Sequence, residues 1–197
     1  DGVYNDADQG IIGCGQPTFN WGWNNTFNYK NFDFSFFVVG FHGFDIYNAT
    51  HQMGYNLIKS QQVAGVTPMR ELLNRWTPTN TNTNIPGFVN GGTENKDFFS
   101  TRFVENGSFI KMKSITLGYT LPETACRALG ITNLRVYASV QNPFHITNYS
   151  GLDPEATMGS PLVQGVDWGS YPNSRNYLIG CFRIGRRQRQ SAGRRRR

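Results

Sequence analysis

Charge and long apolar runs are both scarce in this sequence. Asp, Glu, Lys and Arg make up 16% of the 197 residues, against roughly 25% in an average globular domain. The longest apolar-looking stretch, Phe36–Phe41, is interrupted by Gly40, and no segment reaches the roughly 18 apolar residues that a membrane-spanning helix needs. The composition therefore excludes a helical membrane protein and fits an ordinary soluble domain poorly.

Recognisable sites for metals, cofactors or catalysis are also missing. The three cysteines, Cys14, Cys126 and Cys181, lie far apart, and the three histidines are equally dispersed, without the spacing of a zinc site. The sequence contains no HExxH, GxSxG, P-loop or GxGxxG motif. We expect neither an enzyme nor a bound cofactor, although a site assembled from scattered residues stays open.

The net charge of +6 comes from the C-terminal tail. Eight of the 19 Lys and Arg residues lie in Arg183–Arg197, which leaves 11 basic against 13 acidic residues before them, a net charge of −2. We expect residues 1–182 to form the fold and 183–197 to lie outside it, as the product of a reading-frame change or a gene-prediction artefact. A basic arm for nucleic acid is the less favoured alternative, so no nucleic-acid partner is expected.

The N-terminus shows no initiator Met and no export signal. It lacks both the basic segment and the apolar segment that such a signal requires. We therefore expect the chain to be a piece of a longer protein.

Five segments alternate apolar and polar residues as strands do. In the first, Trp21, Trp23, Phe27 and Tyr29 occupy odd positions, whereas the even positions carry small or polar residues. In the third, Ile115, Leu117 and Tyr119 alternate with Ser, Thr and Gly. The predicted strands are Trp21–Lys30, Phe32–Asn48, Ser108–Leu121, Asn133–Asn142 and Asn173–Phe182.

Two short helices are predicted between these strands. In the first, Thr67 is the candidate N-cap and Pro68 the first helical residue. Its apolar residues have the spacing of one helix face: Met69, Leu72, Leu73 and Trp76. The second covers Glu123–Leu129 and is closed by Gly130.

Strand length and loop length together favour an antiparallel transmembrane β-barrel segment. The strands exceed the usual 5–6 residues. Short and very long connections alternate along the chain, as the short periplasmic turns and long external loops of an outer-membrane barrel do. A soluble sandwich typically has shorter strands and more frequent turns. The alternative of another class is a soluble all-β carbohydrate-binding or adhesion module.

Several short sequence motifs support the barrel and resemble those of a known family. They include Gly40-Phe41-His42-Gly43-Phe44-Asp45-Ile46-Tyr47-Asn48, Glu105-Asn106-Gly107-Ser108-Phe109, Ile115-Thr116-Leu117-Gly118-Tyr119, Asp153-Pro154-Glu155, Gly165-Val166-Asp167 and Tyr171-Pro172-Asn173-Ser174-Arg175. In their order and spacing they resemble the C-terminal end of SusC/RagA-type TonB-dependent outer-membrane transporters, over about residues 1–182.

The resemblance implies an all-β barrel of roughly 22 strands, of which this chain would hold about the last five. It also implies a place in the outer membrane of a Gram-negative cell, with outer-membrane lipid around the barrel. A SusD-like surface lipoprotein and TonB would be the partners, TonB through a missing N-terminal part. Oligosaccharides (glycans) or peptides would be the imported substrates.

Three groups of residues are candidates for sites. Three acidic residues of one loop, Asp153, Glu155 and Asp167, are candidate cation ligands, although such residues are also common in turns, and turns are the favoured interpretation. Three aromatic residues of the loops, Trp76, Trp168 and Tyr171, are candidates for contact with substrate or with the SusD-like lipoprotein, or for packing within their loop. Aromatic and aliphatic residues of the strands are expected to face the membrane: Trp21, Trp23, Phe27, Tyr29, Ile115, Leu117 and Tyr119.

Overall fold

The computed structural model describes residues 9–55, 69–87, 100–128, 130–158 and 164–186. The chain divides into two compact units, which are described separately. The strand unit comprises Trp21–Gly40, Ile110–Ile146 and Ser174–Arg197, and the loop unit comprises Asp1–Asn20, Phe41–Phe109 and Thr147–Asn173. Within the described residues, no helix has the length and apolar character to cross a membrane.

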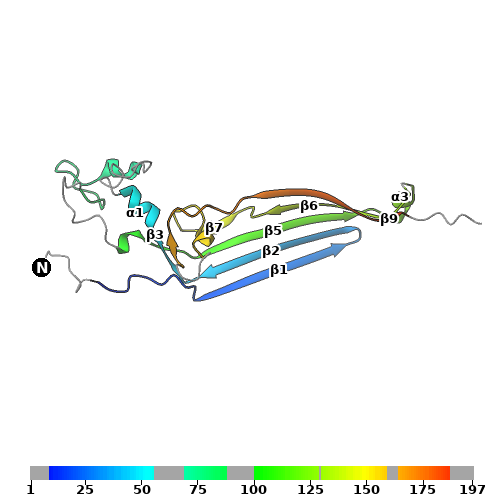
Figure 1. The fold of residues 1–197 in the computed structure, drawn as a ribbon, viewed down its shortest axis with the longest axis horizontal. Helices are drawn as coiled ribbons and strands as arrows, with labels where there is room; N and C mark the ends of the chain where they lie inside the picture. Colours follow the sequence, from blue (N-terminus) through cyan, green and yellow to red (C-terminus); the bar gives the residue numbers. More distant parts are fainter. Residues whose placement is uncertain (1–8, 56–68, 88–99, 129, 159–163, 187–197) are drawn as a thin grey trace, which may run out of the picture. The chain divides into compact units, whose positions relative to one another are not determined.

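Five long strands form one sheet in the order β1-β2-β5-β6-β9 (Figure 1). Their bounds are β1 Phe19–Tyr29, β2 Phe32–His42, β5 Phe109–Thr120, β6 Ile131–Gln141 and β9 Asn176–Arg186. Both β5 and β9 pair antiparallel with β6. Four of the five predicted strands are thus confirmed with shifted ends, and the second only over Phe32–His42. Consecutive long strands are neighbours in the sheet, as in an antiparallel meander.

Two short connections join neighbouring strands of the strand unit. Between β1 and β2, Lys30 adopts a positive φ of 53°, and the Asn31 side chain donates a 2.7 Å hydrogen bond to the carbonyl of Thr120. Between β5 and β6 lies helix α3, Glu123–Ala128, followed by Gly130 at φ 68°. The second predicted helix is therefore confirmed over its described residues.

The strand register gives the sheet one apolar and one polar face. On the apolar face, Leu117 lies opposite Ala138, which lies opposite Ile179. On the polar face, the adjacent row runs from Gly118 to Tyr137 and Gly180. Because side chains alternate along each strand, these rows continue from β5 through β6 to β9. Strand β9 departs from the pattern, since Leu178 lies opposite Ser139 and Phe182 opposite Arg135 on the polar face.

The loop unit contains a small sheet in the order β4-β3-β8. Strand β3 (Asp45–Asn48) pairs antiparallel with β4 (Val104–Asn106) and parallel with β8 (Val166–Asp167). Its core holds Phe44, Ile46 and Phe109, each 3% exposed or less. The other elements of this unit are α1 Ala49–Tyr55 and the 3-10 helices η2 Arg70–Asn74, η3 Thr101–Phe103 and η4 Pro154–Met158. A short strand of the larger sheet, β7 His145–Thr147, pairs with β5.

The predicted single strand Phe32–Asn48 is two strands in the structure. Gly43 adopts φ 73°, and a Cβ there would collide with the side chain of Thr18. The Gly43 N–H donates to Ser108 Oγ instead of continuing a ladder. Since only glycine adopts this conformation without strain, β2 ends at His42 and β3 begins at Asp45.

The first predicted helix is shorter and of another type than expected. Thr67 and Pro68 lie outside the described residues, and η2 is a five-residue 3-10 helix, Arg70–Asn74, with Met69 at its N-cap. Leu72 is 7% exposed, whereas Leu73 is 79% exposed. A 3-10 helix has about three residues per turn, so the α-helical apolar face that was expected to include both leucines does not form.

Strand β9 continues beyond Phe182, the expected end of the fold. Arg183 lies opposite Leu134 and Arg186 opposite Ile131 in the ladder with β6. Backbone pairing needs only N–H and C=O groups, so the basic residues up to Arg186 join the sheet. Residues 187–197 lie outside the described part.

Candidate functional site

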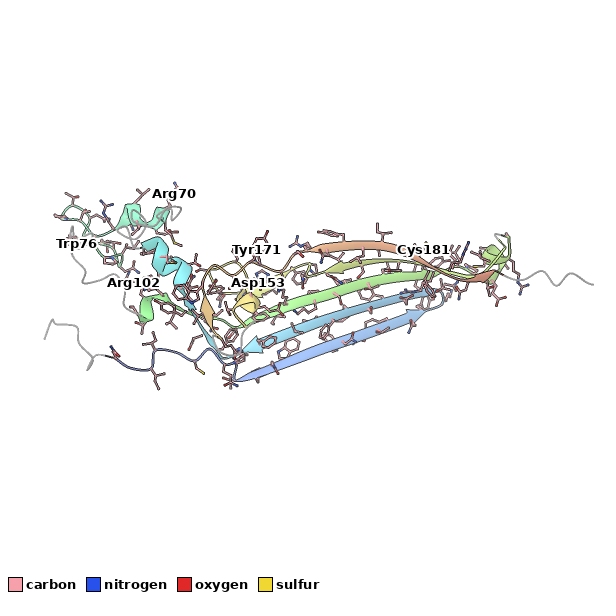
Figure 2. All side chains as sticks on the ribbon, viewed as in Figure 1. Arg70, Trp76, Arg102, Asp153, Tyr171 and Cys181 are labelled. Atoms are coloured by element: carbon pink, nitrogen blue, oxygen red, sulfur yellow. The ribbon has the colours of Figure 1, made fainter. Side chains whose placement is uncertain are left out.

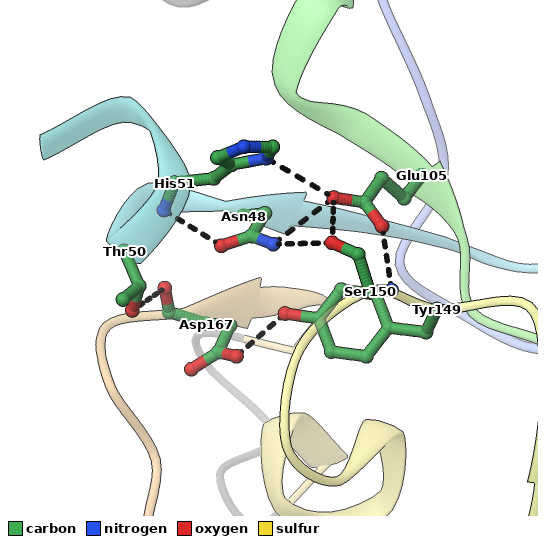
Figure 3. Close-up of polar contacts among 7 residues, drawn as sticks. All are labelled: Asn48, Thr50, His51, Glu105, Tyr149, Ser150 and Asp167. Carbon is green, nitrogen blue, oxygen red and sulfur yellow. Dashed lines mark hydrogen bonds and ion pairs between the residues drawn. The ribbon is translucent and has the colours of Figure 1, made fainter. Parts of the chain in front are cut away.

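Six residues from four segments of the chain meet in the loop unit and form a polar cluster (Figure 3). Its members are Asn48, His51, Glu105, Tyr149, Ser150 and Asp167. Two carboxylates, those of Glu105 and Asp167, hold the adjacent residues Tyr149 and Ser150 between them. Of these six residues, only Asp167 was a predicted site residue. The bonds to Glu105 from Asn48 and Ser150 join residues 57 and 45 positions apart, which no local pattern indicates.

Glu105 accepts several hydrogen bonds. Ser150 donates its backbone N–H at 2.8 Å and its hydroxyl at 2.7 Å. The side-chain amide of Asn48 donates at 3.0 Å, and His51 Nδ1 lies 3.7 Å from the same carboxylate. Strand β4 is thereby joined to the end of β3, to α1 and to the segment after β7.

Asp167 serves a second set of donors. The buried Tyr149 hydroxyl donates to Oδ2 at 2.5 Å, while the N–H groups of Gly169 and Ser170 both donate to Oδ1 at 2.9 Å. A carboxylate that accepts from backbone N–H groups two and three residues ahead closes a tight turn. This turn presents the following residues, beginning with Trp168.

Asn48 connects β3, α1 and Glu105. Its side-chain carbonyl accepts the N–H of His51 at 2.8 Å, which is an N-cap of α1. Its amide nitrogen donates to Glu105 and, at 3.3 Å, to Ser150 Oγ. A residue able to donate and accept at once is required here, which explains an Asn at the end of the strand.

Two groups of the cluster have shifted pKa values. Burial acts to raise the pKa of Glu105, but the hydrogen bonds from Ser150 and Asn48 and the charge of His51 outweigh it and lower that pKa below its usual value. Burial, together with the bond to Asp167 and nearby negative charge, raises the pKa of the Tyr149 hydroxyl. The cluster therefore holds a carboxylate as acceptor and a phenol as donor.

The three candidate cation ligands serve loop structure. Asp153 accepts the N–H of Glu155 at 3.1 Å and that of Asn173 at 3.2 Å, and Glu155 accepts the Asn173 side chain at 3.0 Å. Asp167 faces Tyr149 instead. These hydrogen bonds are those of turns. Among the described residues, no group of three His, Cys, Asp or Glu side chains is placed to hold a metal ion.

The aromatic loop candidates are exposed. Trp76 is 48%, Trp168 60% and Tyr171 90% exposed. Trp168 and Tyr171 lie close together in the sequence, in and directly after the turn at Asp167. Trp76 lies in the separate segment 69–87, where its backbone N–H donates to the carbonyl of Ile85. Figure 2 labels Trp76 and Tyr171 in different parts of the unit.

The predicted membrane-facing residues of β1 contact aromatic residues of β2. Trp23 meets Phe36 edge-on at 5.1 Å between ring centroids, and Phe27 stacks on Phe34 and Phe36. Phe32 meets Tyr119 of β5 at 4.6 Å. The result is an aromatic face that stays exposed, since Trp23 and Phe27 are each 54% exposed.

The polar face carries an ion pair that sequence analysis missed. Arg135 of β6 reaches across Gly118 of β5 and binds Asp33 of β2 through two hydrogen bonds, with Nε 2.9 Å from Oδ1. A Cβ at Gly118 would collide with both partners. The glycine thus provides the space for the pair. Because the partners are 102 positions apart in the sequence, no local pattern indicates the pair.

Comparison with known proteins identifies the family. TonB-dependent receptor P3 of Formosa agariphila is 35% identical over 91% of this chain, and TonB-dependent receptor SusC of Bacteroides thetaiotaomicron 31% identical over 81%. The chain belongs to the SusC/RagA-type TonB-dependent receptors. A solved RagAB peptide transporter matches 85% of the chain with a TM-score of 0.70 and 27% identity. No family model matches.

Membership of this family explains the two-faced sheet. TonB-dependent receptors of this type are outer-membrane barrels, so the fold is a segment of such a barrel. The chain spans 18% of the length of receptor P3, 14% of SusC and 17% of the RagAB chain. The strand unit thus represents a few neighbouring strands of a much larger sheet.

Proposed function

We propose that the chain forms part of the barrel and external loops of a transporter that imports oligosaccharides or peptides across the outer membrane. The observation that carries this proposal is the single sheet with one exposed aromatic face and one polar face, in a chain 35% identical to a TonB-dependent receptor. Such a sheet separates lipid from an aqueous interior.

The apolar face is the proposed lipid contact. It includes the predicted residues Trp21, Trp23, Phe27, Tyr29, Ile115, Leu117 and Tyr119. To these the register adds Val136 and Ile179, which are 40% and 87% exposed. Aromatic side chains with a polar edge suit the membrane interface, and aliphatic ones the hydrocarbon.

The partners of the complete receptor are a SusD-like surface lipoprotein and TonB. Support for the lipoprotein comes from the relatives, since the solved structures contain RagA together with RagB as a peptide importer. The receptor acts by gated passage and catalyses no reaction. Its interior in this segment carries the neutralised Asp33–Arg135 pair rather than an isolated charge.

The soluble carbohydrate-binding module is the less favoured function. A sandwich would cover its aromatic residues with a second sheet. Among the described residues, the aromatic side chains of β1 stay 38–70% exposed, which fits contact with lipid.

Transport is tested with the receptor that contains this chain. The receptor should fractionate with the outer membrane and take up labelled oligosaccharide or peptide only when TonB is present. Recovery in the soluble periplasmic fraction, or uptake that does not depend on TonB, would contradict the proposal.

A further inference from the structure

The polar face of the strand unit carries very little charge. Four rows of paired residues cross β5, β6 and β9 on this face: Ser114 with Gln141 and Asn176, Thr116 with Ser139 and Leu178, Gly118 with Tyr137 and Gly180, and Thr120 with Arg135 and Phe182. Most of these residues are glycines or carry hydroxyl or amide groups, and Arg135 is the one charged residue among them. The face therefore offers mainly neutral hydrogen-bonding groups to the water beside it.

The charge of Arg135 is neutralised on the same face. Its guanidinium donates two hydrogen bonds to the carboxylate of Asp33, with Nε 2.9 Å from Oδ1. The guanidinium carbon also lies 5.4 Å from the centre of the Tyr137 ring, a distance at which a cation is attracted to the ring. These contacts join Asp33, Arg135 and Tyr137 into one group.

Two glycines leave the space that this group occupies. A Cβ at Gly118 would collide with both Asp33 and Arg135, and a Cβ at Gly180 would collide with the Tyr137 ring. The side chains from β6 therefore lie over the neighbouring strands on either side. This arrangement fixes the guanidinium where it meets the Asp33 carboxylate.

Asp33 occupies the part of Arg135 that would otherwise bind an anion. An arginine presents its donors in a rigid fork that matches a carboxylate, a sulfate or a phosphate. Here Nε and a terminal nitrogen both donate to Asp33. The pair stays in contact with water, because Asp33 is 26% and Arg135 36% exposed. A solute that touches this wall can reach the pair but meets a charge that is already neutralised.

We propose that Asp33 masks Arg135 and thereby sets the charge specificity of passage along this wall. Cargo contacts the wall through uncharged hydroxyl and amide groups, and its ionic groups are not retained. Asp33 and Arg135 are specificity-determining residues, while Tyr137 is a positioning residue. This inference rests on the proposed function, which places the polar face toward the aqueous interior of the transporter.

The test measures binding of matched probes to the detergent-solubilised receptor by fluorescence anisotropy. The probes are a labelled glucose hexasaccharide and a labelled Gly-Ser hexapeptide, each prepared uncharged, with added carboxylates or with added amines. Asp33→Asn frees Arg135, so the carboxylate forms should bind about threefold to fivefold more tightly, as expected for a partly exposed ion pair. Arg135→Gln leaves Asp33 without its cation, so the amine forms should gain by a similar factor. The uncharged forms should keep their Kd in both variants.

The double variant and a second ion pair of the same unit are the controls. Asp33→Asn combined with Arg135→Gln makes the wall neutral again and should bind every form within about twofold of the wild type. Glu123→Gln frees Arg127 of α3, an ion pair whose side chains are 79% and 63% exposed, and should change no Kd by more than about twofold. A general loss of stability would weaken all forms together and could not produce opposite preferences in the two single variants.

A second measurement does not depend on the cargo. Phenylglyoxal modifies accessible arginine side chains, and mass spectrometry reports the rate at each position. Asp33→Asn should increase the rate at Arg135 several-fold and leave the rate at Arg127 unchanged. Glu123→Gln should have the reverse effect.

Three outcomes would overturn the inference. One is an unchanged Kd for the charged forms in both single variants. Another is an equal weakening of all forms in both variants, which would assign the pair to stability alone. The third is equal reactivity of Arg135 in the wild type and in Asp33→Asn. Failure of the proposed function looks different, because the wild-type receptor would then show no TonB-dependent uptake, whatever the charge preference of the variants.

Discussion

The strand unit and the loop unit are each stabilised by a different kind of hydrogen bonding. In the strand unit, backbone ladders join each strand to its neighbour, and the side chains follow a two-residue alternation. In the loop unit, side chains such as Glu105 and Asp167 bind backbone and side-chain groups from distant segments. Regular backbone pairing tolerates many side chains, whereas a polar cluster depends on particular ones.

The two units therefore differ in which substitutions they tolerate. A sheet face needs a general property, apolar or polar, at each position. The polar cluster needs a specific donor or acceptor at each position, because an unpaired buried group costs free energy. We therefore expect the strand unit to tolerate substitutions that keep a residue apolar or polar. The polar cluster of the loop unit should tolerate only substitutions that keep the same donor or acceptor in place.

The largest effect is expected on the apolar face of the strand unit. Phe27→Arg places a charge against lipid and should reduce the free energy of unfolding by about 2–4 kcal/mol if the site lies near the bilayer midplane. Thr26→Arg, one residue away on the polar face, should cost much less. Denaturant titration of the receptor refolded into lipid vesicles compares the two. Equal losses would contradict the assignment of the faces.

Removal of the Glu105 carboxylate should open the loop unit and leave the strand unit intact. Glu105→Ala leaves the donors of Ser150 and Asn48 without their acceptor, at a cost of about 1–3 kcal/mol. Hydrogen exchange at the Ser150 amide should become faster, while exchange within β5 and β6 stays unchanged. Glu105→Gln, which retains one oxygen, should show a smaller effect. Faster exchange in both units would show that they do not unfold separately.

A smaller effect is expected for the ion pair of the polar face. Asp33 and Arg135 are 26% and 36% exposed, so water screens their attraction, and we expect a coupling energy of about 0.2–1 kcal/mol. A double-mutant cycle with Asp33→Asn and Arg135→Gln measures it. A coupling of several kcal/mol would mean that this unit also depends on a specific polar contact.

The smallest effect is a pH dependence of the loop unit. The folded state lowers the pKa of Glu105 below its ordinary value of 4.5, so its contribution is complete above that pH and is lost as the pH falls through the lower folded pKa. Hydrogen exchange of the loop unit should therefore accelerate below about pH 4.5. Glu105→Gln should remove this dependence, and its persistence in that variant would assign it to another carboxylate.

A few residues illustrate which features of the fold could be predicted from the sequence and which could not. The alternation of Trp21, Trp23, Phe27 and Tyr29 predicts strand β1 and its apolar face, because a two-residue period is a local property. The end of β2 was missed, since the φ of Gly43 depends on Thr18 and Ser108. The pair of Asp33 and Arg135 was missed for the same reason, as only the register of three strands brings them together.

The long strands, apart from the end of β2, and the family could be predicted from the sequence, because they depend on local alternation and on the order of short motifs. Tertiary structure decided what the motifs do: Glu105, Asp167, Tyr149 and Ser150 become one cluster, and the carboxylates that suggested a cation site instead shape the turns beneath Trp168 and Tyr171. The physical reason is that a hydrogen bond has a range of about 3 Å, so its partners are known only once the chain has folded.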